Sequence, residues 1–527
     1  MARSSQTRMS FTRSIAIPKR ENVTASVVKQ MKVRQTLKSR PAWTVLSILL
    51  VSLVLRWILI LRGGQYYIAD ETRYEVSRDA ARLLAQGQLG EALRQFTISP
   101  EHLAFKVIGI IPALLEQLVG PSLVLPAMFF SLFSILNLYL IYLLSQRGQV
   151  SINEPLYALF FASSSLSLLY YSRHLFPYDL AMSFGLFALY LATTQPQTTK
   201  TSLACGGLSF LCFIAYNGYW ALAGFAMLVN VLLEERAVAR ILKRAIWTAA
   251  GFVAPFVLLI IVLLATGTNM ISALRLFATS ITQGTFEEGW RLPFEYFWHT
   301  EHLTILVIGL LSVVSAIHFF RTKHRYAGVW ISGIVFIYLC LFIPSVLLHS
   351  FVVYARLTRQ LLPFLILLSA HGLVLFEERK QVSHSLVIVL LAGVFIQAAW
   401  NFKASYQLFY PRQFSETLQS QFRGFEFSTK RLAYGAPTLC QSNGYVIENT
   451  KYFLSAPEST PPVKGELLRD VPHPVNFLPY QYEGYTPQQR QEFRERQLKM
   501  RFYKADEEFL SNPEREIKNC AIQGDKE

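Results

Sequence analysis

Long, continuously apolar stretches recur along the chain, separated by short polar segments. A run of about twenty apolar residues crosses roughly 30 Å of hydrocarbon as a helix. The runs are apolar throughout and do not alternate, which argues against membrane-spanning strands. The pattern predicts an all-α polytopic membrane protein. We expect eleven spans, at residues 43–61, 122–144, 155–171, 176–193, 202–216, 218–233, 246–266, 302–320, 328–348, 359–376 and 384–401.

The segment 202–233 fits either one long tilted helix or two short helices broken at Asn217-Gly218. Cytoplasmic loops of membrane proteins carry an excess of Lys and Arg. If the segment is two helices, all the basic loops between spans fall on the cytoplasmic side. If it is one helix, the last three of these loops fall outside. The charges therefore favour two short spans.

The predicted spans divide the chain into three parts. Residues 1–42 form a basic cytoplasmic tail with ten Lys and Arg residues and one acid. Because this tail is too long for an ordinary cleaved signal peptide, we expect the first span to be a retained anchor. Residues 43–401 form the transmembrane domain. Residues 402–527 form a small, nearly neutral extramembrane region on the non-cytoplasmic side, with a helix expected at 487–509.

The first outer loop, residues 62–120, contains two segments with helical amphipathic periodicity, 71–86 and 103–118. Helices of this kind can lie in the plane of the lipid headgroups. They can equally pack on the protein as a small lid. The pattern leaves both possibilities open.

Composition agrees with the membrane prediction. The chain is 52% hydrophobic and 16% charged, whereas soluble domains carry about 25% charged residues. Its formal charge is +16, but the basic residues lie in the tail and loops, so no nucleic-acid partner is expected. Cys440 and Cys520 share the C-terminal region, and we expect a disulfide between them if that region faces an oxidising compartment.

Ionisable residues gather at the outer ends of the predicted spans. A charge inside a span costs roughly 2.5–3.5 kcal/mol on insertion scales, so Arg56 and Asp179 need a partner, a wet cavity or a path to the interface. Basic residues on the outer side also oppose the usual charge bias. They indicate an anion bound at the outer membrane face. The outer ionisable residues are Arg56, Asp70, Glu71, Glu101, His102, Lys106, Arg173, His174, Asp179, Glu287, Glu288, Arg356 and Arg359.

Three motifs occur in order across residues 43–401. Asp70-Glu71 follows the first span, a Ser172-Arg173 pair is followed by Asp179, and a later span begins with Arg359-Gln360-Leu361-Leu362-Pro363. In these features the chain resembles the membrane-embedded glycosyltransferases of the GT-C fold. It looks closest to the branch that includes protein O-mannosyltransferases and aminoarabinose transferases. Members of that branch often carry a proline pair in the first loop, which is absent around His102 and Lys106.

The resemblance implies an inverting glycosyltransferase that uses a polyprenyl-phosphate-linked sugar. The acceptor is a lipid, a glycan or a protein on the non-cytoplasmic face, and membrane lipids surround the site. The lipid phosphate is a good leaving group, so the enzyme needs a base for the acceptor hydroxyl and cations for the departing phosphate. The catalytic candidates are Asp70 as base, with Glu71 and Asp179. The candidates for binding the donor phosphate are Lys106, Arg173, Arg356 and Arg359, and those for a supporting role are Arg56, His102 and His174.

Each candidate has a structural alternative. Glu71 can cap a helix, Asp179 can pair with Arg173 or Arg56, and Arg173-His174 can form a solvated turn. The sequence indicates no particular cofactor, and a divalent metal ion is the one candidate. Glu287-Glu288 could hold a divalent metal ion, although adjacent acids in a loop are usually only solvated.

A His299, Glu301 and His302 cluster also has the residue types of a metal site. Its spacing fits no standard zinc motif, and it lies at the start of a span. We therefore favour an interfacial role for these three residues.

Two other functions fit an integral membrane protein. A transporter or lipid flippase is the main alternative, with the break at Asn217-Gly218 as its best supporting feature, because transporters bind substrates at broken helices. The sequence shows no internal repeat, however, and a non-catalytic scaffold does not explain the outward cations. A bacterial inner membrane is expected, with the site on the periplasmic side. No retention signal ends the chain, and the only glycosylation sequon, at Asn22, lies in the cytoplasmic tail.

Overall fold

The structure is a computed structural model of the 527-residue chain. It describes residues 40–62, 65, 71, 73–98, 100–120, 122, 124–194, 197–233, 237–265, 290–343, 347, 355–378, 384–407, 445–446, 452–455, 465–472, 490–491, 495 and 499–505. The chain divides into two units, Met1–Ser47 and Ile48–Glu527. The first contains the start of helix α2 (Arg40–Leu61). Every contact discussed below lies within the second.

Six described helices are long and apolar enough to cross a membrane. This confirms a polytopic helical membrane protein, while the number of eleven crossings stays a prediction. The six segments are Ala42–Leu61, Val124–Ser145, Val238–Ala265, Leu303–Thr322, Ala355–Glu377 and Ser385–Tyr406, and the shorter apolar helices are Tyr178–Ala192, Thr199–Ala215, Asn217–Leu232 and Arg325–Leu341.

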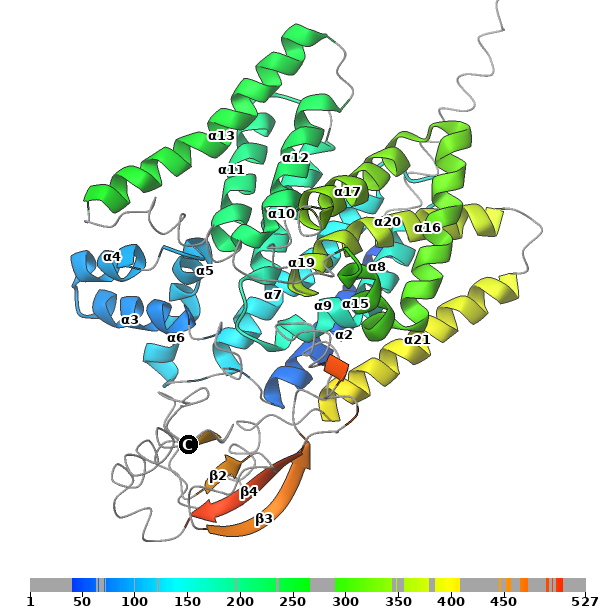
Figure 1. Ribbon diagram of the computed structural model, residues 1–527. Coiled ribbons are helices and arrows are strands. Elements are labelled where there is room, and N and C mark those ends of the chain that lie inside the picture. The colour runs from blue at the N-terminus through cyan, green and yellow to red at the C-terminus, as the bar shows by residue number, and fades with distance from the viewer. Residues whose placement is uncertain are drawn as a thin grey trace, which may run out of the picture. The chain divides into compact units, whose positions relative to one another are not determined.

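The helices follow the order of the predicted spans (Figure 1). The predicted span 155–171 is divided at Ser165 into two short helices, α8 and α9. The helices of the transmembrane domain are α7 (Val124–Ser145), α8 (Glu154–Ser164), α9 (Leu166–Tyr170), η2 (Tyr171–Arg173), α10 (Tyr178–Ala192), α11 (Thr199–Ala215), η3 (Asn217–Tyr219), α12 (Trp220–Leu232), α13 (Val238–Ala265), α15 (Leu292–Glu301), α16 (Leu303–Thr322), α17 (Arg325–Leu341), α19 (Ala355–Thr358), η4 (Arg359–Leu361), α20 (Leu362–Glu378) and α21 (His384–Gln407).

The ambiguous segment 202–233 forms two helices, as its flanking charges predict. Helix α11 ends at Ala215, the short turn η3 follows, and α12 begins at Trp220. The two helices pack against each other and against α13 (Figure 1). A single tilted helix is therefore excluded.

Glycines let two pairs of helices approach to backbone contact. A Cβ atom added to Gly206 of α11 would lie 2.1 Å from the carbonyl oxygen of Thr248 in α13. One added to Gly251 of α13 would lie 2.2 Å from the carbonyl oxygen of Leu203. Helices α16 and α20 meet in the same way at Gly372. Small residues at such interfaces increase the dispersion contacts that hold membrane helices together.

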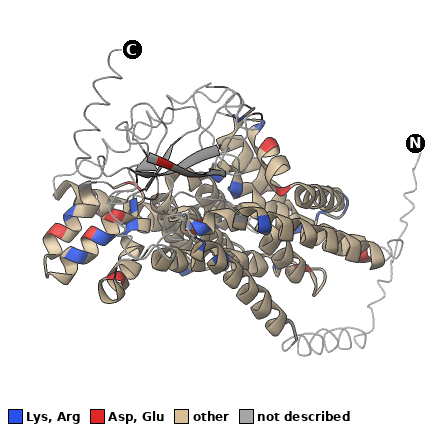
Figure 2. Cartoon of the chain, turned by 90° about the horizontal axis from the view of Figure 1, so that it is seen from below, with Lys and Arg blue, Asp and Glu red and all other residues tan. Residues whose placement is uncertain are grey.

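The first outer loop folds into four helices, α3 (Tyr74–Ala85), α4 (Leu89–Ile98), α5 (Leu103–Ile108) and α6 (Ile110–Val119). Helices α3, α5 and α6 lie in the predicted amphipathic segments, whereas α4 was not predicted. Figure 2 shows charges of both signs on the short helices of this loop, whereas the long helices carry few. Ala80, Ala92 and Phe96 form a small core between α3 and α4.

The C-terminal region contains a four-stranded antiparallel sheet in the order β1-β2-β4-β3. The strands are β1 (Tyr445–Val446), β2 (Tyr452–Ser455), β3 (Gly465–Pro472) and β4 (Lys499–Ala505). The predicted helix 487–509 is therefore wrong, because β4 occupies its second half and pairs with both β2 and β3. The Arg501-Phe502-Tyr503 sequence has aromatic residues that favour strands, and long-range pairing decides the conformation.

Several predicted features lie outside the described residues. They are the base candidate Asp70, the pair Glu287-Glu288 and the two cysteines of the predicted disulfide, Cys440 and Cys520.

Candidate functional site

An ion pair between two distant segments forms the centre of the site. Arg359 of η4 donates from Nη2 to Asp179 Oδ1, in the first turn of α10, at 2.5 Å. Both side chains are buried. The direct partner of Asp179 is thus Arg359, which was not among the partners considered from the sequence, because η4 brings Arg359 to the start of α10.

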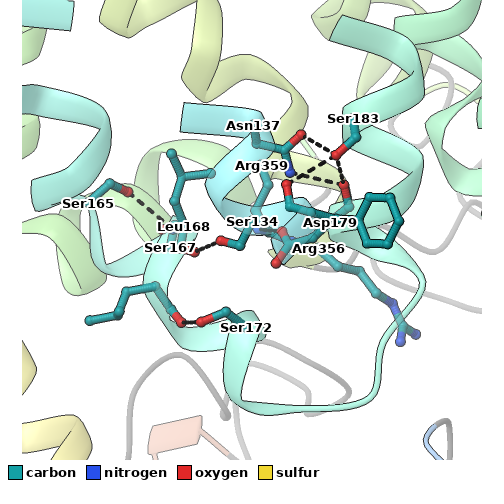
Figure 3. Close-up of polar contacts among 12 residues, drawn as sticks. Ser134, Asn137, Ser165, Ser167, Leu168, Ser172, Asp179, Ser183, Arg356 and Arg359 are labelled. Carbon is teal, nitrogen blue, oxygen red and sulfur yellow. Dashed lines mark hydrogen bonds and ion pairs between the residues drawn. The ribbon is translucent and has the colours of Figure 1, made fainter. Parts of the chain in front are cut away.

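Two neutral side chains hold the backbone at Asp179. Asn137 of α7 donates from Nδ2 to the carbonyl oxygen of Asp179 at 2.9 Å. The hydroxyl of Ser183 lies 2.8 Å from the Asn137 side-chain oxygen and 2.9 Å from the same Asp179 carbonyl. Figure 3 shows these side chains grouped around the start of α10, with Arg359 reaching Asp179. Helices α7 and α10 thus fix the position of the carboxylate.

The Arg359 guanidinium has hydrogen-bonding capacity left over. Its Nε and Nη1 atoms are buried and have no hydrogen-bond partner among the described residues. Its Cζ atom lies 4.2 Å from the centroid of the Tyr171 ring, which supports it by a cation–π contact. A buried N–H group without a partner costs roughly 1–3 kcal/mol. These two nitrogens are therefore suited to binding an acceptor oxygen from a ligand.

Arg56 adds a second buried cation. It lies in α2 and donates to the Ser134 hydroxyl at 2.9 Å, to the Ser52 carbonyl at 3.1 Å and to the Leu168 carbonyl at 3.3 Å. Among the described residues no carboxylate is hydrogen-bonded to it. It interacts electrostatically with both Asp179 and Arg359. Two guanidinium groups therefore share one carboxylate, and an anion would complete the charge balance.

Aromatic side chains connect this pair to the neighbouring segments. The Tyr171 and Tyr178 rings meet edge to face at 5.5 Å, and Tyr178 meets Tyr216 at 4.8 Å. Arg356 donates from Nη1 to the Tyr178 hydroxyl at 2.5 Å. The predicted phosphate ligands Arg356 and Arg359 thus lie at one aromatic cluster.

The acidic motif of the first loop reaches the same segment. Glu71 is fully buried, and its Oε1 accepts a hydrogen bond from the backbone N–H of Leu175 at 2.8 Å. Its Oε2 lies 3.3 Å from Nδ1 of His174. The structure therefore brings Glu71 and His174 together, in a contact between the first outer loop and the segment from Arg173 to Asp179.

Two further candidates from the sequence are Lys106, which lies in α5, and His102, which directly precedes this helix. Lys106 is buried, lies 3.9 Å from the Glu101 carboxylate and interacts electrostatically with Arg73. Burial lowers the pKa of Lys106 to about 8, an effect that Glu101 opposes and Arg73 reinforces. His102 has a left-handed backbone with φ 56°, stacks on Tyr216 at 5.3 Å and contacts the Ala215 carbonyl at 3.1 Å.

Another predicted phosphate ligand, Arg173, contacts α21. Arg173 donates from Nη1 to the carbonyl oxygen of Ser405 in α21 at 2.8 Å, and its own carbonyl accepts from Gln65 at 3.1 Å. This contact ties η2 to α21 and differs from the contact to Asp179 that the sequence left open.

Gln360 is a residue that the sequence analysis did not single out. Its Oε1 accepts from the backbone N–H of Leu222 at 3.2 Å, and its Nε2 donates to the Gly218 carbonyl at 3.0 Å. With His102 on Ala215, two carbonyls of the α11–α12 break are thus taken by other parts of the protein. The break joins α5 to the turn that carries Arg359.

Glu301 has a role that its place in the His299, Glu301 and His302 cluster did not indicate. Its fully buried carboxylate accepts hydrogen bonds from the Ser165 hydroxyl at 2.7 Å and from the backbone N–H groups of Leu166 and Ser167 at 3.0 and 2.8 Å. It therefore anchors the start of α9, which leads into the Arg173 turn. A signal existed: Glu301 ends α15, where the helix dipole disfavours a carboxylate without an outside partner.

Metal binding was considered for the acidic and histidine residues. Within the part of the chain that the structure describes, no group of three or more His, Cys, Asp and Glu side chains could hold a metal ion. The Glu287-Glu288 pair lies outside that part.

Comparison with known proteins gives a limited result. No protein-family model and no curated protein matches the chain. Among solved structures, the chain is similar to the archaeal oligosaccharyltransferase AglB from Archaeoglobus fulgidus, in complex with an inhibitory peptide and a dolichol-phosphate. The identity is 12% and the TM-score 0.42, over 70% of this chain and 56% of that one. The chain thus matches little more than half the length of that protein, and a likeness at this level assigns neither a family nor an activity.

Proposed function

We propose that this protein is an integral-membrane, inverting glycosyltransferase of GT-C type. It transfers a sugar from a polyprenyl-phosphate donor to an acceptor on the non-cytoplasmic face. The observation that carries the proposal is the buried Arg359, which has two guanidinium nitrogens without a hydrogen-bond partner among the described residues and lies near a second buried arginine.

The buried cations suit the leaving group of this reaction. When the bond between the anomeric carbon and the phosphate oxygen breaks, negative charge accumulates on the lipid phosphate. Preorganised cations in a site of low dielectric constant stabilise such charge more strongly than water does. Each of the two Arg359 nitrogens, Nε and Nη1, can donate a charge-assisted hydrogen bond to a phosphate oxygen. Asp179 keeps Arg359 in position, so it acts as a positioning residue.

The acidic pair Asp70-Glu71 supplies the other half of the reaction. In the proposal Asp70 accepts the proton of the acceptor hydroxyl, whose oxygen attacks the anomeric carbon from the face opposite the phosphate. The polyprenyl phosphate then leaves with the bonding electrons. Glu71 holds its segment against Leu175. General-base catalysis of this kind typically contributes roughly 10²- to 10⁴-fold.

Lys106 and Arg356 complete the proposed phosphate site. Lys106 carries a pKa of about 8 because it is buried, so it is mostly protonated at neutral pH. A phosphate next to it would raise that pKa by favouring the charged form. Arg356 is positioned by its hydrogen bond to Tyr178.

The more specific parts of the proposal rest on the sequence resemblance. They are the branch of O-mannosyl- and aminoarabinose transferases, the bacterial inner membrane and the periplasmic location of the site. The acceptor remains a lipid, a glycan or a protein.

The break between α11 and α12 gives little support to the alternative that the protein is a transporter or flippase. Transporter helices break where backbone groups are needed for substrate or ions. Here the Ala215 and Gly218 carbonyls are occupied by His102 and Gln360. These contacts favour a structural role for the break.

The test uses the full-length protein in liposomes, supplied with a panel of polyprenyl-phosphate-linked sugars and with membrane extract as the source of acceptor. The readout is release of polyprenyl phosphate together with sugar transferred. Asp70→Asn should abolish transfer, while membrane insertion and the thermal midpoint stay unchanged. Asp79→Asn, at an exposed acid of α3, is the matched control and should keep full activity. If Asp70→Asn retains activity, or if no donor is consumed by the wild type, the proposal is wrong. Glycolipid and glycoprotein profiles of a deletion strain would identify the acceptor.

A further inference from the structure

An apolar cavity of about 570 Å³ lies behind the turn that carries Arg359. Its walls come from α15, α16, α17 and the η4–α20 segment, and almost all of its lining is apolar. Phe294, Phe297 and Trp298 of α15 form an aromatic wall, and Tyr338 of α17 faces them. Its volume is within the usual range of ligand-binding pockets.

The cavity and the Arg359 site lie on opposite sides of one segment. Leu361 and Leu365 line the cavity, and residues four apart share one face of a helix. Arg359 precedes Leu361 by two positions, about 240° around the 3₁₀ turn η4, and its guanidinium reaches Asp179 on α10. A molecule in the cavity would therefore contact the back of the arginine turn without contacting the guanidinium.

A missing side chain creates part of this space. Gly309 of α16 lines the cavity, and a Cβ atom added there would have no heavy atom within 4 Å. The glycine is thus not required by close helix packing, in contrast to Gly206 and Gly251. Its absent side chain leaves room for a ligand.

The surroundings identify the occupant. Helix α16 is a candidate span, and its exposed apolar residues Leu306, Leu310 and Val313 continue outward from the cavity. The cavity thus opens among the described residues onto the surface that a bilayer would cover. A void without contact atoms forfeits dispersion energy, and lipid chains are the molecules that such a surface meets.

We infer that this cavity is a binding site for one alkyl chain of a bilayer phospholipid. The bound chain packs against the aromatic wall on one side and against Leu361 and Leu365 on the other. Because these leucines follow Arg359 directly, the chain buttresses the turn that holds the Arg359–Asp179 pair. The site is separate from the proposed donor site and does not depend on the proposed reaction.

The experiment uses the full-length protein in nanodiscs that contain phosphatidylethanolamine with a photoreactive diazirine in its alkyl chain. After illumination, mass spectrometry maps the labelled residues. We expect dense labelling of Phe294, Trp298 and Leu306. Helix α21, whose Val389 and Ile396 are exposed but line no cavity, gives the background labelling of lipid-facing surface.

Two variants test whether the cavity itself is responsible. Gly309→Leu fills the space and should reduce labelling of α15 several-fold, while labelling of α21 is unchanged. Leu310→Phe adds bulk at the next residue, outside the cavity lining, and should have no effect. If Gly309→Leu fails to fold, Leu306→Phe fills the cavity from another exposed lining position.

Three outcomes would overturn the inference. The first is wild-type labelling of α15 and α16 no denser than that of α21. The second is labelling that neither filling variant reduces. The third is displacement of the phospholipid label by a polyprenyl phosphate added in small amounts, which would assign the cavity to the carrier lipid instead. The thermal midpoint is measured for each variant in parallel, so that loss of labelling through unfolding is recognised.

Discussion

The buried Asp179–Arg359 pair should be strongly coupled energetically. Asp179→Asn removes the carboxylate but keeps the size of the side chain, so it leaves two buried guanidinium groups without a counter-charge among the described residues. Breaking a buried ion pair from one side costs about 3–5 kcal/mol. Asp179→Asn and Arg359→Gln should therefore each lower the stability of the folded protein substantially.

The double variant Asp179→Asn/Arg359→Gln separates coupling from simple loss of contacts. It removes both charges, so no uncompensated ion is created at this pair. We expect its cost to be smaller than the sum of the two single costs, with a coupling free energy of about 1–3 kcal/mol. The control is Asp79→Asn, at the exposed Asp79–Arg82 pair, which has a similar distance of 2.6 Å. An exposed pair contributes at most about 1 kcal/mol.

The assay measures the temperature at which half of the detergent-solubilised protein still elutes as a monodisperse peak in size-exclusion chromatography. In a chain of this length 1 kcal/mol moves a midpoint by about 2 °C or less, so each single variant at the buried pair should lose several degrees and Asp79→Asn almost none. Strict additivity of the two single variants would refute the coupling. So would a fall for Asp79→Asn equal to that for Asp179→Asn.

Three further predictions follow from contacts described above. Because burial holds the pKa of Lys106 near 8, its positive charge is lost as the pH rises through that value, and sugar transfer at low donor concentration should fall over the same pH range. Lys106→Arg should move this fall to higher pH. An unchanged pH profile would contradict a role of Lys106 in phosphate binding. Glu301→Gln weakens the anchoring of α9 and should cost about 2 kcal/mol or more, as estimated for a charged group with buried partners; a midpoint equal to wild type would show that the carboxylate is dispensable. Gly206→Ala should destabilise the folded protein by about 1–3 kcal/mol through overpacking. Gly207→Ala should be neutral or stabilising, because its added Cβ atom meets only the Gly251 carbonyl oxygen, at 3.8 Å. The same thermal midpoint for both variants would argue against backbone contact between α11 and α13.

The helical part of the fold could be predicted because long apolar runs have few alternatives in a membrane. The break at Asn217-Gly218 followed from loop charges, and the structure confirms it. The strand β4 could not be predicted from its own residues, because its partners β2 and β3 lie far away in the sequence. A helix was expected there, but pairing with β2 and β3 makes the segment a strand.

The site, too, could be predicted only as far as local sequence allows. The sequence identified Asp179 as a charge inside a span that needs a partner and Arg359 as a candidate for binding the donor phosphate, but 180 positions separate them, and nothing local indicates that they meet. It gave Arg173 and Arg56 as possible partners of Asp179, whereas Arg359 forms the ion pair and Arg173 donates a hydrogen bond to the Ser405 carbonyl. Gln360 was overlooked because its role consists of hydrogen bonds to backbone groups of other segments. Such contacts leave no pattern in the chain.

The reciprocal glycines of α11 and α13 have a consequence for motion. Sliding between these two helices would force each backbone over the carbonyl oxygens of the other, since no side chain separates them at Gly206 and Gly251. We therefore expect α11 and α13 to move as one rigid body. We therefore expect any rearrangement that admits a bulky substrate to take place at helix interfaces formed by side chains. The contact between Phe225 of α12 and Phe336 of α17 is one such interface.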